Sequence, residues 1–363
     1  MAVDSYPHYR WLREQAPVWR SPLGFWLLTR HADLTTFFTD RSLRREYEVG
    51  QTLRTGPEVG KQEYFQLFGR MLFILDDPEH QRVRRVFAAA FTPKRVTAHS
   101  PRTAAIGDDL LDAVEGQGHM DLVTDFAAQL PKRVIGQLLG VPENDHLLIG
   151  GWADAVGPAF EFLPMDPDVL ASTNRTCRDL YDYFSDLADQ RAREPRDDLM
   201  TAMVHATTED DERLTHDEGV SNAVLLYIAG QQTTAGGLGL SILALHRNPD
   251  QLALLKSEPD LMANAVEELL RYDHPAHATI RITTQPTLFT DVEVPAGEAV
   301  VGYVGAALHD PDAFPDPDRL DLRRDFTTRP ITFGGGPYLC LGHNLARSEI
   351  SHGLSALLRR HPT

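Results

Sequence analysis

The residues best suited to chemistry lie in a glycine-rich stretch, Phe333–Gly342, which contains Cys340 and precedes a helical pattern. Backbone amides at the start of a helix favour a thiolate over a thiol, and glycines let the backbone approach a flat, bulky group. A soft anionic sulfur presented in this way suits iron or another soft metal. A lone cysteine is more often a small buried apolar residue, so Cys340 by itself predicts packing in a core.

The spacing of the residues around Cys340 favours metal binding instead. The residues of the motif follow in the order Phe333, Gly334, Gly336, Cys340, Gly342, Leu345, Ala346 and Arg347. This pattern resembles the haem-binding loop of the cytochrome P450 superfamily, in which the cysteine thiolate is the fifth ligand of the iron. The resemblance extends from about Tyr6 to the end of the chain, and it is to the soluble bacterial members.

The resemblance implies a fold, a cofactor and an activity. The fold is mainly α with small β-sheets, and haem b (iron protoporphyrin IX) lies between a long central helix and the helix after Cys340. The activity is that of a haem-thiolate monooxygenase, which uses O2 to hydroxylate an organic substrate, or to couple or desaturate it in secondary metabolism. In the loop, Phe333, Tyr338 and Gly342 are implied to contact the haem.

Glu268 and Arg271 stand three positions apart, which places both side chains on one face of a helix. Such pairs are common on exposed helices and contribute little to stability there. Here they resemble the Glu-x-x-Arg motif of the family, and Arg319 matches the arginine that completes its ion-pair triad. The implied role is structural, because the triad fastens the segment that presents Cys340.

His80 and Arg84 stand four positions apart on a basic helix face, which by itself predicts a solvated surface. Two carboxylates in a partly buried site need cationic donors, and the forked guanidinium of arginine matches them. His80 and Arg84 resemble the family's pair that binds the haem propionates, and Arg281 resembles a third propionate ligand. We therefore expect all three residues in the cofactor site.

A stretch of small and polar residues, Ala229–Thr234, interrupts the most apolar part of the sequence. A glycine inside a helix costs roughly 1 kcal/mol relative to alanine and weakens the helix locally. The stretch resembles the oxygen-binding bend of the family's central helix, where Gly230 permits the bend and the Thr233 hydroxyl orients the protons delivered to oxygen. Packing between helices is the alternative role for these residues.

Three features depart from the family pattern. Gln232 stands where a carboxylate is usual, and a neutral amide can orient water but cannot act as a general acid. Gly230, Gln232 and Thr233 are nevertheless the candidate catalytic residues. Tyr338 replaces the histidine that often precedes the cysteine by two positions, so this contact carries no positive charge. The chain also stops at Thr363, soon after the last predicted helix, where the family usually continues into a β-hairpin.

Helical spacing dominates the chain and must position these motifs. Predicted helices lie at Ala32–Phe38, from Asp77 as the N-cap through Phe87, within Ala104–Glu194, and at Ala223–Leu245, Pro259–Tyr272 and Asn344–Arg360. Alternating, β-branched residues predict strands at Val18–Arg20, Phe25–Thr29, Ile280–Thr284, Leu288–Val294 and Ala299–Val304. The segment His309–Pro337 is rich in proline and glycine, so we expect it to be irregular and held by specific contacts.

The composition limits the classes of protein that fit. The chain has 363 residues and a net charge of −17, which argues against a general binder of nucleic acid or of an anionic membrane. No linker divides the sequence, so we expect one domain over residues 1–363. Two cysteines, with no signal or membrane-spanning pattern, indicate a reduced, cytoplasmic protein, and we expect a monomer.

We expect separate proteins to supply the electrons, because the printed sequence shows no flavin or iron–sulfur module. The resemblance implies a ferredoxin and a ferredoxin reductase as these partners, with O2 and an organic molecule as substrates. We expect an acidic electron carrier to dock on basic residues near Cys340, since opposite charges steer such encounters. The candidate docking residues are Arg82, Arg85, Lys94 and Arg347.

The substrate is expected to be small and largely apolar or aromatic. Arg44–Leu72 and Gly151–Arg193 correspond to the family's pocket-forming regions and contain several aromatic residues. Two other functions remain open. A haem-binding sensor that does not turn its ligand over fits the ligation motifs and the amide at Gln232. A thiol-dependent hydrolase would use Cys340 with the nearby His343, but it leaves the other motifs unexplained.

Overall fold

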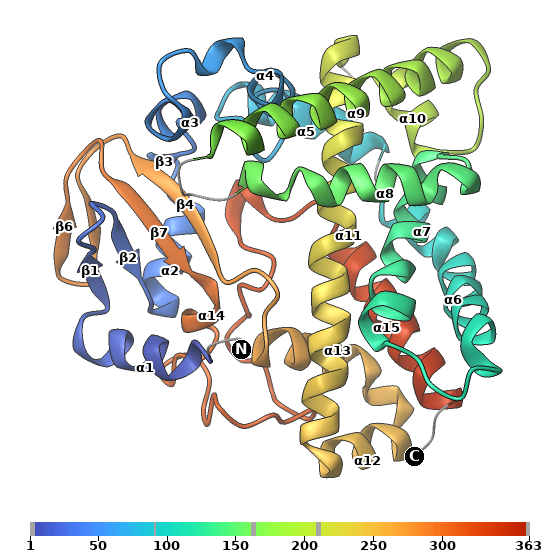
Figure 1. Ribbon diagram of the computed structural model, residues 1–363. Helices are drawn as coiled ribbons and strands as arrows, with labels where there is room; N and C mark the ends of the chain where they lie inside the picture. The colour runs from blue at the N-terminus through green and yellow to red at the C-terminus, as the bar shows by residue number, and fades with distance from the viewer. Residues whose placement is uncertain (1–3, 91, 161–164, 208–211, 361–363) are drawn as a thin grey trace. The chain divides into compact units, whose positions relative to one another are not determined.

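The computed structural model describes residues 4–90, 92–160, 165–207 and 212–360. The Cα positions group into two compact units, each built mainly of helices and described by itself (Figure 1). The sheet unit comprises Met1–Arg45 and Gly236–Thr363, and the helical unit comprises Glu46–Ala235. None of the described helices has the length and apolar content needed to cross a lipid bilayer.

A five-stranded sheet with the strand order β1-β2-β7-β4-β3 organises the sheet unit. Its strands are β1 Val18–Arg20, β2 Trp26–Leu28, β3 Leu43–Arg44, β4 Ala278–Thr283 and β7 Ala299–Tyr303. Strands β2 and β7 pair in parallel, and the other neighbours are antiparallel. Strands from the two ends of the sequence thus meet in one sheet, where the residues of β3 lie beside those of β4.

One predicted strand is two strands in the structure. The run Leu288–Val294 falls in a hairpin of β5 (Thr287–Phe289) and β6 (Val292–Val294). The chain turns at Thr290, whose φ is 49°. The Asp33 carboxylate stabilises this turn, because it accepts hydrogen bonds from the Thr290 amide (2.7 Å) and hydroxyl (2.8 Å). Since Asp33 is distant in sequence, the β-branched run does not reveal the turn.

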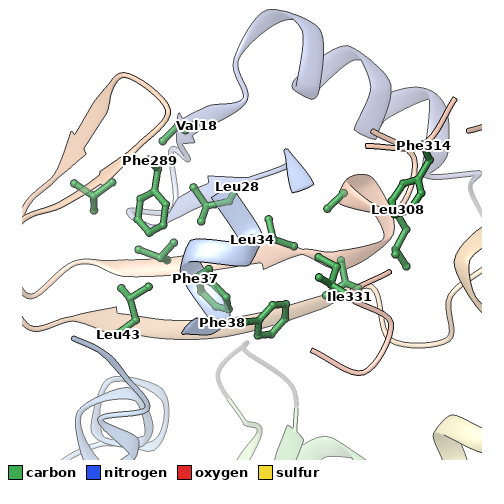
Figure 2. Close-up of a cluster of buried hydrophobic side chains, with 14 residues drawn as sticks. Val18, Leu28, Leu34, Phe37, Phe38, Leu43, Phe289, Leu308, Phe314 and Ile331 are labelled. Atoms are coloured by element: carbon green, nitrogen blue, oxygen red, sulfur yellow. The ribbon is translucent and has the colours of Figure 1, made fainter. Parts of the chain in front are cut away.

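Helix α2 (His31–Thr39) packs its apolar side chains onto the sheet (Figure 2). Its residues Leu34, Phe37 and Phe38 belong to one buried hydrophobic cluster. The other labelled members of this cluster are Val18, Leu28, Leu43, Phe289, Leu308, Phe314 and Ile331 (Figure 2). Each such side chain contributes roughly 1.5–3 kcal/mol when it is fully buried. The cluster therefore fixes α2 firmly against the sheet.

The remaining helices of the sheet unit are α1 Tyr6–Gln15, α12 Pro249–Ser257, α13 Met262–Tyr272, α14 Val304–Ala307 and α15 His343–Arg360. Two of them, α13 and α15, match predicted helices, and α1, α12 and α14 were not predicted. Helix α12 is not among the predicted helices, because Pro249 was expected near a helix end, whereas proline also fits a first helical turn. Helix α13 packs against α15, and most of the predicted irregular segment lacks regular structure.

The helical unit holds the longest helices of the chain. They are α3 Tyr47–Thr55, α4 Glu63–Phe68, α5 Glu79–Ala90, α6 Pro93–Glu115, α7 Gln129–Leu139, α8 His146–Ala155, α9 Pro167–Arg193, α10 Leu199–His205 and α11 His216–Arg247. The last turns of α11, from Gly236 onward, belong to the sheet unit.

Helix α11 begins before the apolar run Ala223–Leu245 from which the sequence predicts it. Thr215 and Glu218 form a capping box at its start. The Glu218 N–H donates to the Thr215 hydroxyl over 3.2 Å, and the Thr215 N–H donates to the Glu218 carboxylate over 2.8 Å. The first turns of the helix are thus polar and capped, so the apolar run underestimates its length.

Candidate active site

Cys340 lies in a loop that the backbone itself closes. The Cys340 N–H donates to the Phe333 carbonyl oxygen over 3.0 Å, and a short turn at Gly336–Tyr338 precedes the start of α15 at His343. Cys340 is exposed, whereas Cys177 is buried in α9, and this burial raises the pKa of the Cys177 thiol to about 12. Of the two cysteines, Cys340 is therefore the one whose sulfur can reach a ligand.

Two glycines of the loop are required by their contact with α2. Gly336 has a φ of 58°, and a Cβ at this position would lie 2.7 Å from the Phe38 carbonyl oxygen. Gly334 has a φ of 72°, and its Cβ would lie 3.3 Å from the Phe38 ring. These two glycines thus accommodate α2. At Gly342, in contrast, a Cβ would meet no described atom within 4 Å, so there the backbone has open space beside it.

Side chains from α15 and from the residues just after α13 hold the start of the loop. His274, which follows α13, is buried, and its Nε2 lies 2.7 Å from the Thr332 carbonyl oxygen. Burial lowers the pKa of His274. The Arg347 guanidinium lies 4.4 Å from the centre of the Phe333 ring and forms an ion pair with Glu267. The backbone and the aromatic ring at the start of the loop are therefore each fixed by a separate contact.

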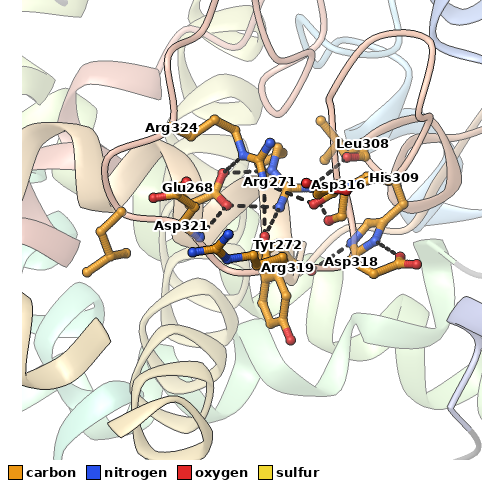
Figure 3. A network of polar contacts seen from close by, with 12 residues as sticks. Glu268, Arg271, Tyr272, Leu308, His309, Asp316, Asp318, Arg319, Asp321 and Arg324 are labelled. Carbon is orange, nitrogen blue, oxygen red and sulfur yellow. Dashed lines mark hydrogen bonds and ion pairs between the residues drawn. The ribbon is translucent and has the colours of Figure 1, made fainter. Parts of the chain in front are cut away.

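The pair Glu268 and Arg271 on α13 is completely buried. Arg271 Nε donates to Glu268 Oε2 over 2.7 Å (Figure 3). Arg271 also donates to the carbonyl oxygens of Leu308 (2.9 Å) and Pro317 (2.8 Å). Because both carbonyls belong to the segment that leads to the Cys340 loop, the pair fastens this segment to α13.

The arginine side chain that completes this network is Arg324, and this corrects the prediction for Arg319. Arg324 Nε donates to Glu268 Oε2 over 2.9 Å, and its side chain is 7% exposed (Figure 3). Arg319 has an exposed side chain and contributes its carbonyl oxygen, which accepts a hydrogen bond from Arg324 Nη2 over 2.9 Å. Both arginines lie in one irregular segment, so the path of the backbone decides which side chain turns inward.

Arg281, on β4, lies beside the loop residue Tyr338. Its Cζ is 5.0 Å from the centre of the Tyr338 ring and 5.4 Å from the centre of the Phe37 ring. Arg281 is 2% exposed. A guanidinium binds carboxylates through paired hydrogen bonds. Of the residues implied to contact haem, the structure thus brings Arg281 and Tyr338 together in the sheet unit.

His80 and Arg84 lie one turn apart on α5, in the helical unit. His80 is 1% exposed, and its Nδ1 lies 3.6 Å from Asp77 Oδ1. Arg82 belongs to a different face of the helix, where it forms an ion pair with Glu218 of α11. The ion pair fixes α5 to the first turn of α11, while His80 and Arg84 share a face that this contact does not use.

The polar residues of α11 divide between exposed and packed positions. Thr233 and Gln232 are exposed, and Thr233 Oγ1 donates to the Ala229 carbonyl oxygen over 3.0 Å. Such a bond to the preceding turn often accompanies a bent helix. Gly230 lies against α7, since a Cβ here would come within 3.1 Å of Ile135. In the helical unit, Gly230 therefore permits close packing of α11 against α7, and Thr233 places a hydroxyl group on an exposed position of α11.

Two buried polar side chains were not predicted from the sequence. Glu349 on α15 is completely buried, and its carboxylate oxygens have no hydrogen-bond partner among the described residues. Burial raises the pKa of Glu349 well above its ordinary value. Gln231 on α11 is 1% exposed, and its amide group likewise has no partner in the described part of the chain. The only signal for either residue is a polar side chain in an otherwise apolar helical stretch.

An exposed cysteine in a loop before a helix, a buried arginine beside an aromatic ring of that loop and a hydroxyl group in a long helix are features of haem-thiolate proteins. Comparison with known proteins identifies the family within this class. Residues 159–362 match the family described as Cytochrome P450. The chain belongs to the cytochrome P450 family, and it is therefore a haem-containing oxidoreductase of the monooxygenase type.

Relatives are similar over almost the whole chain. Nocardicin C N-oxygenase from Nocardia uniformis subsp. tsuyamanensis is 39% identical, and the alignment covers 100% of this chain and 89% of the relative. Vitamin D(3) 25-hydroxylase from Pseudonocardia autotrophica is 36% identical, with 95% and 83% covered. 6-Deoxyerythronolide B hydroxylase from Saccharopolyspora erythraea is 35% identical, with 99% and 89% covered.

Solved structures agree with this assignment. A crystal structure of P450BioI in complex with an acyl carrier protein ligated to hexadec-9Z-enoic acid has a TM-score of 0.91 and 30% identity, and the match covers 99% of this chain and 91% of that chain. The crystal structure of CalO2 also has a TM-score of 0.91, with 32% identity and coverages of 98% and 88%. The predicted P450 fold is thus confirmed.

Proposed function

We propose that this P450 oxidises a largely apolar intermediate of secondary metabolism and that Cys340 is its iron ligand. The observation that carries the proposal is the exposed Cys340 at the start of α15, in a loop closed by the Phe333 carbonyl group. The start of a helix stabilises the thiolate form of such a cysteine. When bound, the haem supplies activation of O2 at an iron to which the thiolate donates electron density.

The residues around the loop fit this cofactor. Haem b has one iron that accepts a soft ligand and two carboxylates that need cationic partners. Cys340 offers an exposed sulfur, and Gly342 leaves open space beside the backbone. We propose that Arg281 binds a carboxylate of haem, and the resemblance implies the same role for His80 and Arg84. Arg281 already lies against Tyr338 of the loop, which supports this assignment.

The proposed catalytic residues of α11 handle protons and water. The Thr233 hydroxyl holds a proton at Oγ1, which now donates to the Ala229 carbonyl oxygen. Gln232 orients water through its amide group but supplies no proton, because an amide does not ionise in this pH range. Gly230 lets α11 approach α7 closely at this level. Protons therefore reach the substrate site from solvent through the Thr233 hydroxyl rather than from a neighbouring acid.

The substrate class follows from the relatives and from the aromatic residues of the helical unit. The relatives are named for oxidation of nocardicin C, vitamin D3 and 6-deoxyerythronolide B. In this chain, Phe68 and Phe73 lie 4.9 Å and 5.8 Å from Phe160 between ring centres. Phe68 and Phe160 come from the two regions expected to form the pocket, Phe73 directly follows the first region, and Phe160 is 36% exposed. They would bind an apolar molecule by contact and not by charge.

The electrons are proposed to come from a ferredoxin and its reductase, within the cytoplasm. The basic residues expected to dock the ferredoxin differ in their surroundings. Arg82 and Arg85 form ion pairs with carboxylates of the helical unit, and Arg347 forms one within the sheet unit. Lys94 is exposed and has no ion pair with any described residue. We therefore propose that Lys94 contributes more to docking than the arginines do.

The ligand assignment is tested by the absorption spectrum of the reduced, carbon monoxide-bound protein. Wild-type protein and Cys177→Ser should show the strongly red-shifted Soret band of thiolate ligation, and Cys340→Ser should lose it. A red-shifted band in Cys340→Ser would overturn the assignment. For docking, Lys94→Glu should slow reduction by the ferredoxin and weaken its salt dependence, whereas unchanged values would contradict the proposed contact.

A further inference from the structure

A second arginine lies beside Tyr338, and it comes from the other end of the sequence. In the sheet, β3 pairs with β4 so that Leu43 is opposite Thr283 and Arg44 is opposite Ile282. Arg45 follows directly and stays beside β4, where its Nη1 is 3.4 Å from Thr279 Oγ1. Side chains of successive strand residues alternate between faces. Arg44 is accordingly exposed, whereas Arg45 is half-buried.

The guanidinium groups of Arg45 and Arg281 approach the same aromatic ring. Arg45 Cζ lies 5.9 Å from the centre of the Tyr338 ring, and Arg281 Cζ lies 5.0 Å from it. Both distances are within the range of a cation–π contact, which holds a guanidinium over a ring. Tyr338 stands two residues before Cys340, in the turn that delivers the cysteine. Two positive charges are therefore gathered at the turn that precedes the proposed iron ligand.

We infer that Arg45 is a further residue that binds the carboxylates of haem, with the Tyr338 ring as the platform that orients it beside Arg281. Like charges at one ring repel each other, and an anionic group placed between or beside them offsets this repulsion. The cofactor brings two carboxylates, and each can accept paired hydrogen bonds from a guanidinium. The inference rests on the proposed role of Arg281, so the test includes a variant of that residue.

The experiment measures the rate at which purified holoenzyme loses haem to excess apomyoglobin. Arg45→Gln keeps hydrogen-bonding groups but removes the charge, so haem loss should be roughly tenfold faster. Arg45→Lys keeps the charge, so its rate of haem loss should lie between those of wild type and Arg45→Gln. Arg44→Gln is the matched control, since its side chain is the exposed neighbour, and it should match wild type. The midpoint potential of Arg45→Gln should also fall, because a nearby cation favours the reduced state.

The platform role predicts a separate result for Tyr338. Tyr338→Phe keeps the ring and should retain haem like wild type, whereas Tyr338→Leu should resemble Arg45→Gln. Adding Arg45→Gln to Tyr338→Leu should then accelerate haem loss little further, because both changes remove the same contact between the Arg45 guanidinium and the Tyr338 ring.

The outcomes distinguish this inference from the proposed function. If Arg281→Gln accelerates haem loss and Arg45→Gln does not, the inference about Arg45 is overturned and the role of Arg281 stands. If neither variant differs from wild type, both assignments fail. Thermal unfolding of each holoenzyme, followed by circular dichroism, identifies a purely structural effect. Should Arg45→Gln and Arg45→Lys lower the melting temperature equally, with no change in potential, Arg45 is structural and the inference is overturned.

Discussion

Arg324 Nε lies 2.9 Å from Glu268 Oε2, inside the protein. The same carboxylate accepts a hydrogen bond from Arg271 Nε over 2.7 Å, so two guanidinium groups share one buried acid. Arg324 further donates to the carbonyl oxygens of Arg319 (2.9 Å) and Asp316 (3.2 Å). A segment without regular structure is thus fixed by charge-assisted hydrogen bonds to α13, upstream of the loop that carries the cysteine.

We expect Arg324→Met to lower the free energy of unfolding by roughly 3 kcal/mol, because it leaves part of the buried Glu268 charge uncompensated. It should also reduce the fraction of purified protein that retains haem. Arg319→Met is the matched control, since its carbonyl contact survives and its exposed side chain is lost, so its effect should stay within about 0.5 kcal/mol. Chemical denaturation followed by circular dichroism measures both. Equal destabilisation would contradict the role of Arg324.

Gly336→Ala should destabilise the Cys340 loop by at least about 2 kcal/mol, because it combines a left-handed backbone with a steric clash. The new Cβ would lie 2.7 Å from the Phe38 carbonyl oxygen. Gly335 provides the control, because its backbone is extended and its Cβ would lie 3.6 Å from the Phe38 side chain, an ordinary contact. Thermal unfolding and the reduced carbon monoxide spectrum report the two effects. A tolerated Gly336→Ala would show that the loop does not need this approach to α2.

The parts of the site that could be predicted depend on residues close together in sequence. The cysteine, its glycines and the helix start lie within ten residues of one another, so their spacing alone carries the geometry. The pair Glu268 and Arg271 is likewise set by the helical repeat. The prediction of the cytochrome P450 family rests on these local motifs, and the relatives confirm it.

The contacts that could not be predicted join segments that are far apart in the chain. The choice of Arg324 over Arg319 depends on the path of an irregular backbone, which no periodicity describes. Arg45 reaches Tyr338 because β3 pairs with β4, and strand pairing between distant segments leaves no local signal. The glycines of the loop were expected to let the backbone approach a flat, bulky group. In the structure, Gly334 and Gly336 instead accommodate α2.

The buried Glu349 predicts that stability changes with pH. In the unfolded chain a glutamate ionises near its ordinary pKa of about 4.3. In the folded protein burial raises the pKa of Glu349, so the folded state binds more protons than the unfolded state above that pH. The free energy of unfolding must then fall as the pH rises toward the folded-state pKa.

Glu349→Gln should remove this dependence. The variant is expected to resemble wild type near pH 4 and to be the more stable protein at about pH 8, where wild type must keep a proton on a buried acid or bury its charge. Glu293→Gln is the control, because it removes an exposed carboxylate of β6. Denaturation across this pH range measures the difference between the variants. A wild-type stability that rises with pH relative to Glu349→Gln would contradict the sign.

Thr233→Ala should separate oxygen consumption from substrate oxidation. The Thr233 hydroxyl is the proposed proton-holding group of α11. The adjacent Gln232 carries an amide, which has no acidic proton that could substitute for this hydroxyl. We expect oxygen uptake to continue while product formed per O2 falls by at least about tenfold and hydrogen peroxide rises, since a positioned proton donor typically contributes a larger factor. Thr233→Ser keeps a hydroxyl group and should restore most of the product yield. If Thr233→Ala and Thr233→Ser both gave the wild-type yield, proton delivery would have to follow a route independent of this hydroxyl. The buried amide of Gln231 would then be the next side chain of α11 to replace.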